Sequence, residues 1–348
     1  MFRLNPTLNV LLLTSIGIAG GMAACGGGGG GGDPLPPCPT GNCGKASFRK
    51  AIPTRQQMLV PFAGASARIG TAAVGEVSAA YGATADHVAE INDTLDGLFE
   101  DLEQLAGTTP EIEEDDLHQW RITEADLDIV LVLTTSDEVQ FQLAYYVGEP
   151  GFDPAPGDEV AASTITVDDE GLNDLTFDID FDELTDRVPE VDAQGLLQVR
   201  FQPFGDEHEI WYDRTGFAVG DDEAEDSITT YWDFGDGDGA LEYIAAFASG
   251  DEATAYVRWD DAGGRYDHHA LLDGAIDHVM TSCWSSGGIE EFDAWMELDG
   301  DQVIDGEIEG VEDDCDFGPV ADHPAPGSDF DDLPQEGEWD DILAQLDE

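Results

Sequence analysis

Apolar residues in the first third of the chain recur at alternating steps of three and four positions: Val88, Ile91, Leu95, Leu98, Leu102 and Leu105. This spacing places them on one stripe of an α-helix. Thr84 is the expected N-cap, Gly107 follows the last apolar position, and Pro110 blocks continuation. An Ala-rich stretch, residues 66–81, predicts an earlier helical piece that ends at Gly82, so the two pieces form a hairpin or one bent helix. The stripe packs either on the protein's own sheet or on a partner helix.

After Trp120 the apolar period changes from helical to two. Residues 127–134 form a dense apolar run, and apolar residues alternate with Gln and Ala at 139–145, which predicts a hairpin. Phe177, Ile179 and Phe181 alternate with acidic residues, which predicts a strand with one apolar and one acidic face. Further strands are expected at 196–202, 209–213, 228–234, 241–248, 253–259, 265–272, 276–283, 292–298 and 303–308.

Short strands joined by Asp/Gly turns are typical of an antiparallel meander, hence a curved sheet or a partly closed barrel. No strands alternate with helices, which disfavours a parallel sheet. The expected fold class is therefore α+β, with an N-terminal helical segment packed on the meander. The expected divisions are a signal peptide (1–24), a Gly/Pro-rich tether (25–46), a helical segment (47–115), the β domain (116–318) and an acidic flexible tail (319–348).

The tail leaves two outcomes open. Trp339, Ile342, Leu343 and Leu346 fall at helical spacing within it, enough for two turns of amphipathic helix. Such a helix either docks on the body of the protein or stays loose in solution.

The N-terminus combines Arg3, an apolar run over residues 10–19 and small residues up to Cys25, which is the layout of a secretory signal. Met22-Ala23-Ala24-Cys25 resembles the lipobox of bacterial lipoproteins, with Met22 where that family usually has Leu. The resemblance implies cleavage before Cys25, lipidation of its thiol and anchoring to the outer membrane or to the outer face of the cell membrane. The alternative is an ordinary signal cut after Ala24 and a freely secreted protein.

Cysteine usage agrees with export. With Cys25 lipidated, an even number remains: Cys38, Cys43, Cys283 and Cys315. In an oxidising compartment an even number favours two disulfides over a metal site. Three pairings are open, and we prefer the local one, Cys38 with Cys43 and Cys283 with Cys315.

Charge sets strong limits on partners. The 77 Asp and Glu residues against 12 Lys and Arg give a formal net charge of −65. Such a field repels nucleic acids, so we expect no nucleic-acid partner. The carboxylates are spread along the whole chain, which favours adaptation of the surface to high salt, where screening weakens their mutual repulsion. Multiple calcium sites are the rival explanation.

Candidate metal ligands are few and weak. Asp178, Asp180 and Asp182 on one strand face are possible calcium ligands, but a solvated acidic face is the favoured explanation. Asp299 and Asp301 are similar to the start of a calcium loop, but the glycine that an EF-hand requires at its sixth position is Ile304. His268, His269 and His278 are the only clustered histidines. Because adjacent strand residues point to opposite faces, His268 and His269 are not expected to bind one metal. We therefore expect no cofactor, with calcium as the one possibility.

A second, looser resemblance involves Arg258-Trp259, Gly263-Gly264-Arg265, Asp273-Gly274 and Cys283-Trp284. These residues are similar to the strand–turn–strand core of uncharacterised envelope lipoproteins, which have no known activity. Residues 260–264 are expected to form the hairpin turn, with Trp259 and Trp284 packing near the disulfide.

No catalytic motif of a serine hydrolase or zinc protease is present. The leading functional hypothesis is a membrane-anchored, non-enzymatic envelope lipoprotein that binds an unknown protein or lipid ligand. A helix over a curved sheet is also the layout of periplasmic lipid and lipoprotein carriers, an analogy at the level of fold alone. The alternatives are a secreted hydrolase that depends on calcium or on paired carboxylates, and a structural component of the cell surface.

Overall fold

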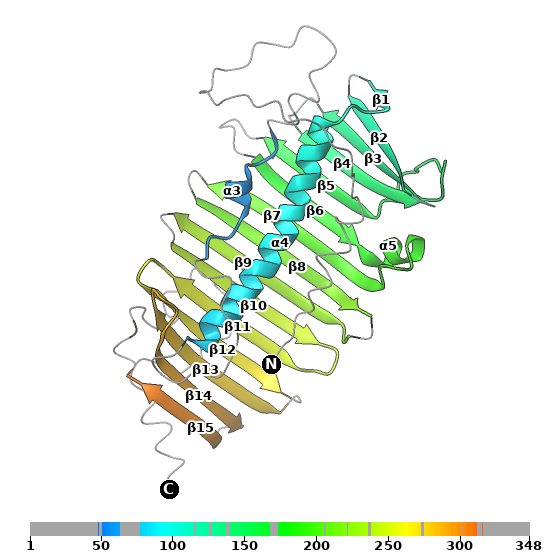
Figure 1. Ribbon diagram of the computed structural model, residues 1–348. Coiled ribbons are helices and arrows are strands. Elements are labelled where there is room, and N and C mark those ends of the chain that lie inside the picture. The colour runs from blue at the N-terminus through cyan, green and yellow to red at the C-terminus, as the bar shows by residue number, and fades with distance from the viewer. Residues whose placement is uncertain are drawn as a thin grey trace.

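A computed structural model describes residue 48 and residues 51–62, 77–114, 116–124, 127–136, 140–167, 173–204, 207–220, 222–235, 238–272, 275–300, 302–311 and 315. Its strands form a single antiparallel sheet in which each strand pairs with its neighbours in sequence (Figure 1). The strands are β1 (Ile112–Glu113), β2 (Leu117–Glu124), β3 (Leu127–Ser136), β4 (Gln140–Gly148), β5 (Ala161–Val167), β6 (Asn173–Asp180), β7 (Ala193–Phe204), β8 (Glu207–Val219), β9 (Glu225–Gly235), β10 (Asp238–Phe247), β11 (Glu252–Trp259), β12 (Gly263–Leu272), β13 (Ile276–Ser285), β14 (Glu290–Asp299) and β15 (Gln302–Gly310).

The predicted meander is confirmed, and the structure decides between its two expected forms, a curved sheet and a partly closed barrel. The sheet order runs from β1 to β15 without a return, so the two end strands do not pair. The expectation of a partly closed barrel is therefore wrong, and the sheet is open.

Two faces arise from the alternation of side chains along each strand. In β7, buried and exposed residues alternate strictly from Ala193 to Phe201. Side chains of one parity, such as Leu197 and Phe201, pack in the main apolar cluster together with the long helix α4. We call that side of the sheet the helix face and the opposite side the outer face.

Helix α4 (Ala79–Gly107) is the predicted amphipathic helix, but it begins earlier than the sequence suggested. Its N-cap is Ser78, whose side chain accepts a hydrogen bond from the backbone N–H of Tyr81. The predicted N-cap, Thr84, lies inside the helix, where its hydroxyl donates to the carbonyl oxygen of Ala80 at 2.9 Å. Gly82 is also internal, so the predicted hairpin at this position is wrong and one helix runs through it. Residues 66–76 of the predicted earlier piece lie outside the described residues.

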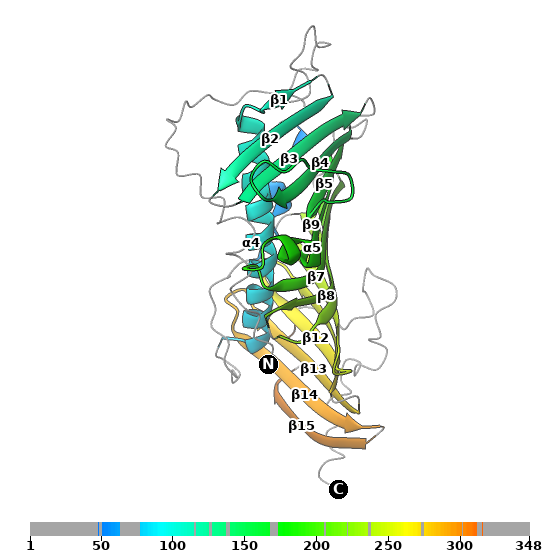
Figure 2. The same cartoon turned by 90° about the vertical axis from the view of Figure 1, so that its right-hand side faces the viewer.

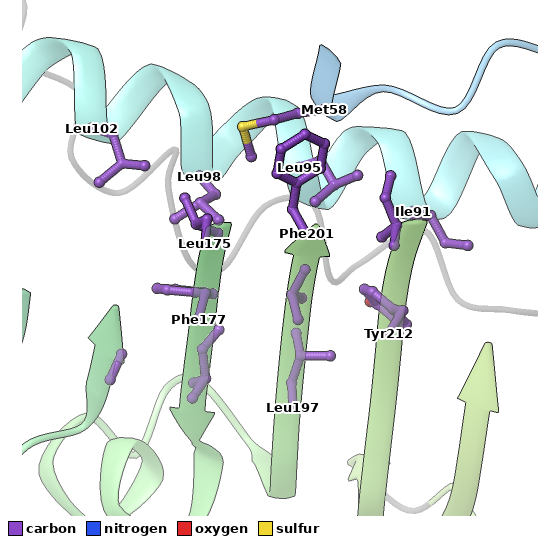
Figure 3. Close-up of a cluster of buried hydrophobic side chains, with 14 of the residues drawn as sticks. Met58, Ile91, Leu95, Leu98, Leu102, Leu175, Phe177, Leu197, Phe201 and Tyr212 are labelled. Atoms are coloured by element: carbon purple, nitrogen blue, oxygen red, sulfur yellow. The ribbon is translucent and has the colours of Figure 1, made fainter. Parts of the chain in front are cut away.

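The six stripe residues of α4 are buried against the sheet, which favours the intramolecular alternative over a partner helix. Figure 1 shows the helix crossing the strands obliquely, and Figure 2 shows it on one side of the sheet only. In the centre, Leu95 and Leu98 meet Leu175 and Phe201 from β6 and β7 (Figure 3). This contact is the core of the molecule.

The ends of α4 are held by polar contacts. The backbone N–H of Ser78 donates to the carbonyl oxygen of Gly288, between β13 and β14, at 2.8 Å. At the other end, the indole N–H of Trp120 in β2 donates to the carbonyl oxygen of Thr108 at 3.3 Å. The helix therefore bridges strands that lie far apart in the sheet.

Two short segments cover the helix face on either side of α4. On one side, residues 51–62 include helix α3 (Arg55–Met58), and the backbone of Val60 exchanges two hydrogen bonds with the side chain of Asn92. On the other side lies helix α5 (Phe181–Arg187). The predicted strand through Phe181 is wrong at its end, because the Asp180 side chain caps α5 by accepting from the N–H of Glu183.

The predicted disulfide between Cys283 and Cys315 is confirmed. The two tryptophans expected beside it lie instead on the helix face, where Trp259 contacts Phe62 and Trp284 contacts Tyr81. Cys283 and Trp284 are adjacent in β13 and so point to opposite faces. The turn expected at 260–264 is present, with the N–H of Asp260 donating to the carbonyl oxygen of Gly263.

Within the ranges described above, no helix is both long and apolar enough to cross a membrane.

Candidate functional site

A strip of the helix face on β10–β14 is the candidate ligand site among the described residues. Helix α5 packs on β4 and β7, toward one end of these strands. Figure 1 shows no labelled helix over the corresponding ends of β10–β14. We call this region the aromatic strip and define it by ten residues: Tyr243, Ala245, Ala253, Ala255, Tyr266, His268, Ala270, His278, Met280 and Trp295.

The floor of the aromatic strip is made of alanines. Ala245, Ala253 and Ala270 are direct cross-strand partners in β10, β11 and β12. All three are at most 3% exposed, yet they belong to neither apolar cluster of the described fold. A methyl group projects far less from a sheet than a ring does, so the alanines contribute little side-chain volume between the rings that flank them.

One flank of the strip is a continuous row of rings. The ring of Tyr266 lies 5.9 Å from that of His268 in β12, His268 lies 5.8 Å from His278 in β13, and His278 lies 6.0 Å from Trp295 in β14, all as centroid distances. The other flank joins the sheet to α4, where the rings of His87 and Tyr243 are 4.9 Å apart. Such rings offer large apolar area with defined geometry.

The histidines of the strip are neutral at neutral pH. Burial and, to a smaller extent, the neighbouring His278 and His269 together lower the pKa of His268 to about 3. Burial also lowers the pKa of His278, and burial together with Arg214 lowers the pKa of His87 to about 4. The strip is thus an uncharged surface on a protein of net charge −65.

Carboxylates gather on the helix face where α4 begins. Glu290 accepts a hydrogen bond from the hydroxyl of Ser282 at 2.6 Å and lies at the capped N-terminus of α4. Nearby, burial and, to a smaller extent, the charges of Glu290 and Glu309 together raise the pKa of Asp293 to about 7. Asp293 is therefore partly protonated at neutral pH.

The predicted calcium ligands are not brought together. Asp178 accepts a hydrogen bond from the side chain of Gln198, Asp180 caps α5, and Asp182 lies within α5 and accepts from the N–H of Gly195. The shared strand face expected for the three is wrong for Asp182. Asp299 ends β14, and Asp301 lies outside the described residues. In the part of the chain that the structure describes, no three His, Cys, Asp or Glu residues are placed to hold a metal ion.

The other predicted site residues divide in two. Cys25, Cys38 and Cys43 lie outside the described residues. His268 and His269 point to opposite faces as expected: His268 joins the ring row, whereas His269 contacts Asp277 at 3.1 Å on the outer face.

The clustered histidines were recognisable in the sequence, whereas the alanine floor and the aromatic partners were not. Two alternating patterns in the sequence indicate the strip: Tyr266-His268-Ala270 in β12 and Tyr243-Ala245 in β10. Their alignment depends on strand register, which the sequence does not state.

Comparison with protein-family models, with curated proteins and with solved structures finds no match to this chain.

Proposed function

We propose that this protein is an envelope lipoprotein, anchored through Cys25, whose aromatic strip binds an acyl chain of a lipid. The lipobox and the glycine run at residues 26–32 support the anchor and a tether that holds the body off the membrane. Acyl chains are uncharged along their length, so they avoid the repulsion that anionic ligands meet on so acidic a protein.

The observation that carries the ligand is the alanine floor. Ala245, Ala253 and Ala270 are buried outside both apolar clusters and lie beside a row of neutral rings. The flanking rings of Tyr266, His268 and Trp295 are only half-buried, and an apolar chain that packs on them removes their remaining exposed area from water, at about 25 cal/mol per Å². The open sheet places the strip on a face and not inside a barrel.

The anchor is tested by metabolic labelling. Cells that express the full chain in the presence of labelled palmitate should give a labelled protein in the membrane fraction. A Cys25→Ser variant should lose the label and leave that fraction. Labelled wild-type and unlabelled variant protein would support the anchor, and an unlabelled wild-type protein would contradict it.

The ligand is tested by organic extraction of the purified protein followed by mass spectrometry of non-covalent lipid. Ala245→Phe places a ring on the floor of the strip and should abolish the extracted lipid. Ala246→Phe is the matched control, because Ala246 is the next residue of β10 and is exposed on the outer face. Absence of lipid from the wild type, or equal lipid in both variants, would refute acyl-chain binding at the strip.

Overpacking of a buried alanine typically costs about 1–3 kcal/mol, so the folding of Ala245→Phe needs a check by circular dichroism. Trp295→Ala removes a ring from the flank without adding volume and provides a second variant with the same expected loss of lipid.

A further inference from the structure

The outer face of the sheet changes character along its length. On β7–β10 it exposes large apolar residues: Leu196 is 41%, Trp211 43% and Ile244 40% exposed. On β11–β14 the middle of the same face is buried, with Tyr256 at 1% and Met296 at 3% exposed. If the whole outer face met only water, its side chains on β11–β14 would be as exposed as those on β7–β10.

The buried part of the outer face contains charge. Asp267 is 1% exposed. Its carboxylate accepts one hydrogen bond from Nε–H of Arg265 at 3.0 Å and another from the hydroxyl of Thr281 at 2.9 Å. Arg265 is itself 2% exposed. An ion pair removed from water to this degree costs several kcal/mol of desolvation, so a covering layer must compensate through other contacts.

A second apolar cluster lies around this ion pair. Its buried members come from β10–β14: Ala240, Tyr256, Val279, Cys283, Phe292, Ala294 and Met296. Of the described residues packed on it, Cys315 alone lies outside the sheet strands. The disulfide to Cys283 fixes Cys315 on the outer face, with a Cα–Cα distance of 5.7 Å. Cys315, five residues beyond the end of β15, is therefore held against this face.

We infer that residues 316–348 lie across the outer face of β10–β14 and form the missing layer over the second apolar cluster. This inference is independent of the aromatic strip, which is on the other face. Four strand spacings of about 4.8 Å give a span of roughly 19 Å. The 33 residues that follow Cys315 reach roughly 110 Å when extended, so length does not limit this path.

The composition of the segment suits this position. Trp339, Ile342, Leu343 and Leu346 form an apolar stripe at helical spacing. The exposed Ile228 and Ile244, which are direct cross-strand partners, lie beside the buried area and extend the apolar surface toward β9. An acidic segment also keeps its remaining carboxylates in water on the side away from the sheet.

Methionine oxidation tests the inference in the full-length protein. Met296 lies on the outer face and Met58 lies beneath α4, and the two are 3% and 0% exposed. In a chain that ends at Gly318 and keeps the disulfide, peroxide should oxidise Met296 at least tenfold faster than in the full chain. Met58 should stay unchanged. Equal rates of Met296 oxidation in the two chains would overturn the inference.

A photo-crosslink keeps the inference falsifiable if the shortened chain does not fold. Benzoylphenylalanine at Ile244 in the full chain should crosslink to a peptide from residues 316–348 of the same molecule. Mixing ¹⁵N-labelled and unlabelled protein separates crosslinks within one chain from crosslinks between chains. A crosslink to another molecule, or to no part of residues 316–348, would show that a different layer covers this face.

Discussion

Replacing Leu95 by Ala tests whether α4 is fixed on the sheet as the core requires. Leu95 is fully buried at the centre of the helix, against β6–β8 (Figure 3). The substitution removes three carbon groups at about 0.8 kcal/mol each, or about 2.4 kcal/mol of transfer free energy. The cavity left behind raises the expected loss of unfolding free energy to about 3–5 kcal/mol.

Urea unfolding in molar salt measures this loss. With an m value of about 3 kcal/mol/M, the midpoint should fall by about 1 M or more. Leu196→Ala is the matched control, because Leu196 is 41% exposed on the outer face and should lose less than about 1 kcal/mol. A Leu95→Ala midpoint no lower than that of Leu196→Ala would show that α4 is not packed on the sheet.

Further predictions concern charge. The melting temperature should rise from dilute buffer to molar NaCl, because screening shortens the Debye length from about 10 Å at 0.1 M to about 3 Å at 1 M; a flat melting temperature would rule out salt adaptation, and a rise with CaCl₂ alone would favour calcium sites. Glu90→Gln should lower the free energy of unfolding in urea by about 3–5 kcal/mol, because it leaves the buried guanidinium of Arg214 without its ion-pair partner. The same change at the exposed Glu103 should lower it by less than about 0.5 kcal/mol. Equal losses in the two variants would refute the role of the ion pair. The raised pKa of Asp293, about 7 against the usual 3.8, means that the folded state keeps a proton that the unfolded chain has lost, so this group's contribution to stability falls as pH rises from about 4 to about 7 and is constant above. Asp293→Asn should remove that fall and Asp299→Asn should not, and parallel pH profiles for the wild type and Asp293→Asn would contradict the assignment.

Much of the fold could be predicted from the sequence because large apolar residues and polar residues alternate regularly in most elements. The stripe of Leu residues in α4 and the alternation in most strands gave clear periods. Where contrast was weak the predictions failed: β5 is built from Ala, Ser, Thr and two apolar residues and was missed. The start of α4 was misplaced because the first turns bury alanines such as Ala80 and Ala85, which give little amphipathic signal.

Alternation alone also misled where a polar residue changed its role. The pattern through Phe177, Ile179 and Phe181 is that of a strand. The side chain of Asp180, however, accepts a hydrogen bond from the backbone N–H of Glu183 and caps α5. The candidate site was harder still. Ala245, Ala253 and Ala270 come from three strands and become neighbours only through cross-strand register, which long-range packing sets.

Quenching of tryptophan fluorescence by the uncharged methyl ester of a dibrominated fatty acid is the most direct test of acyl-chain binding at the aromatic strip. Bromine quenches on contact, and Trp295 is the tryptophan that lies in the strip among the 7 of the chain. Acyl-chain binding predicts saturable quenching in the wild type that is largely lost in Trp295→Phe. Quenching that does not saturate, or that is equal in Trp295→Phe, would contradict the proposed function.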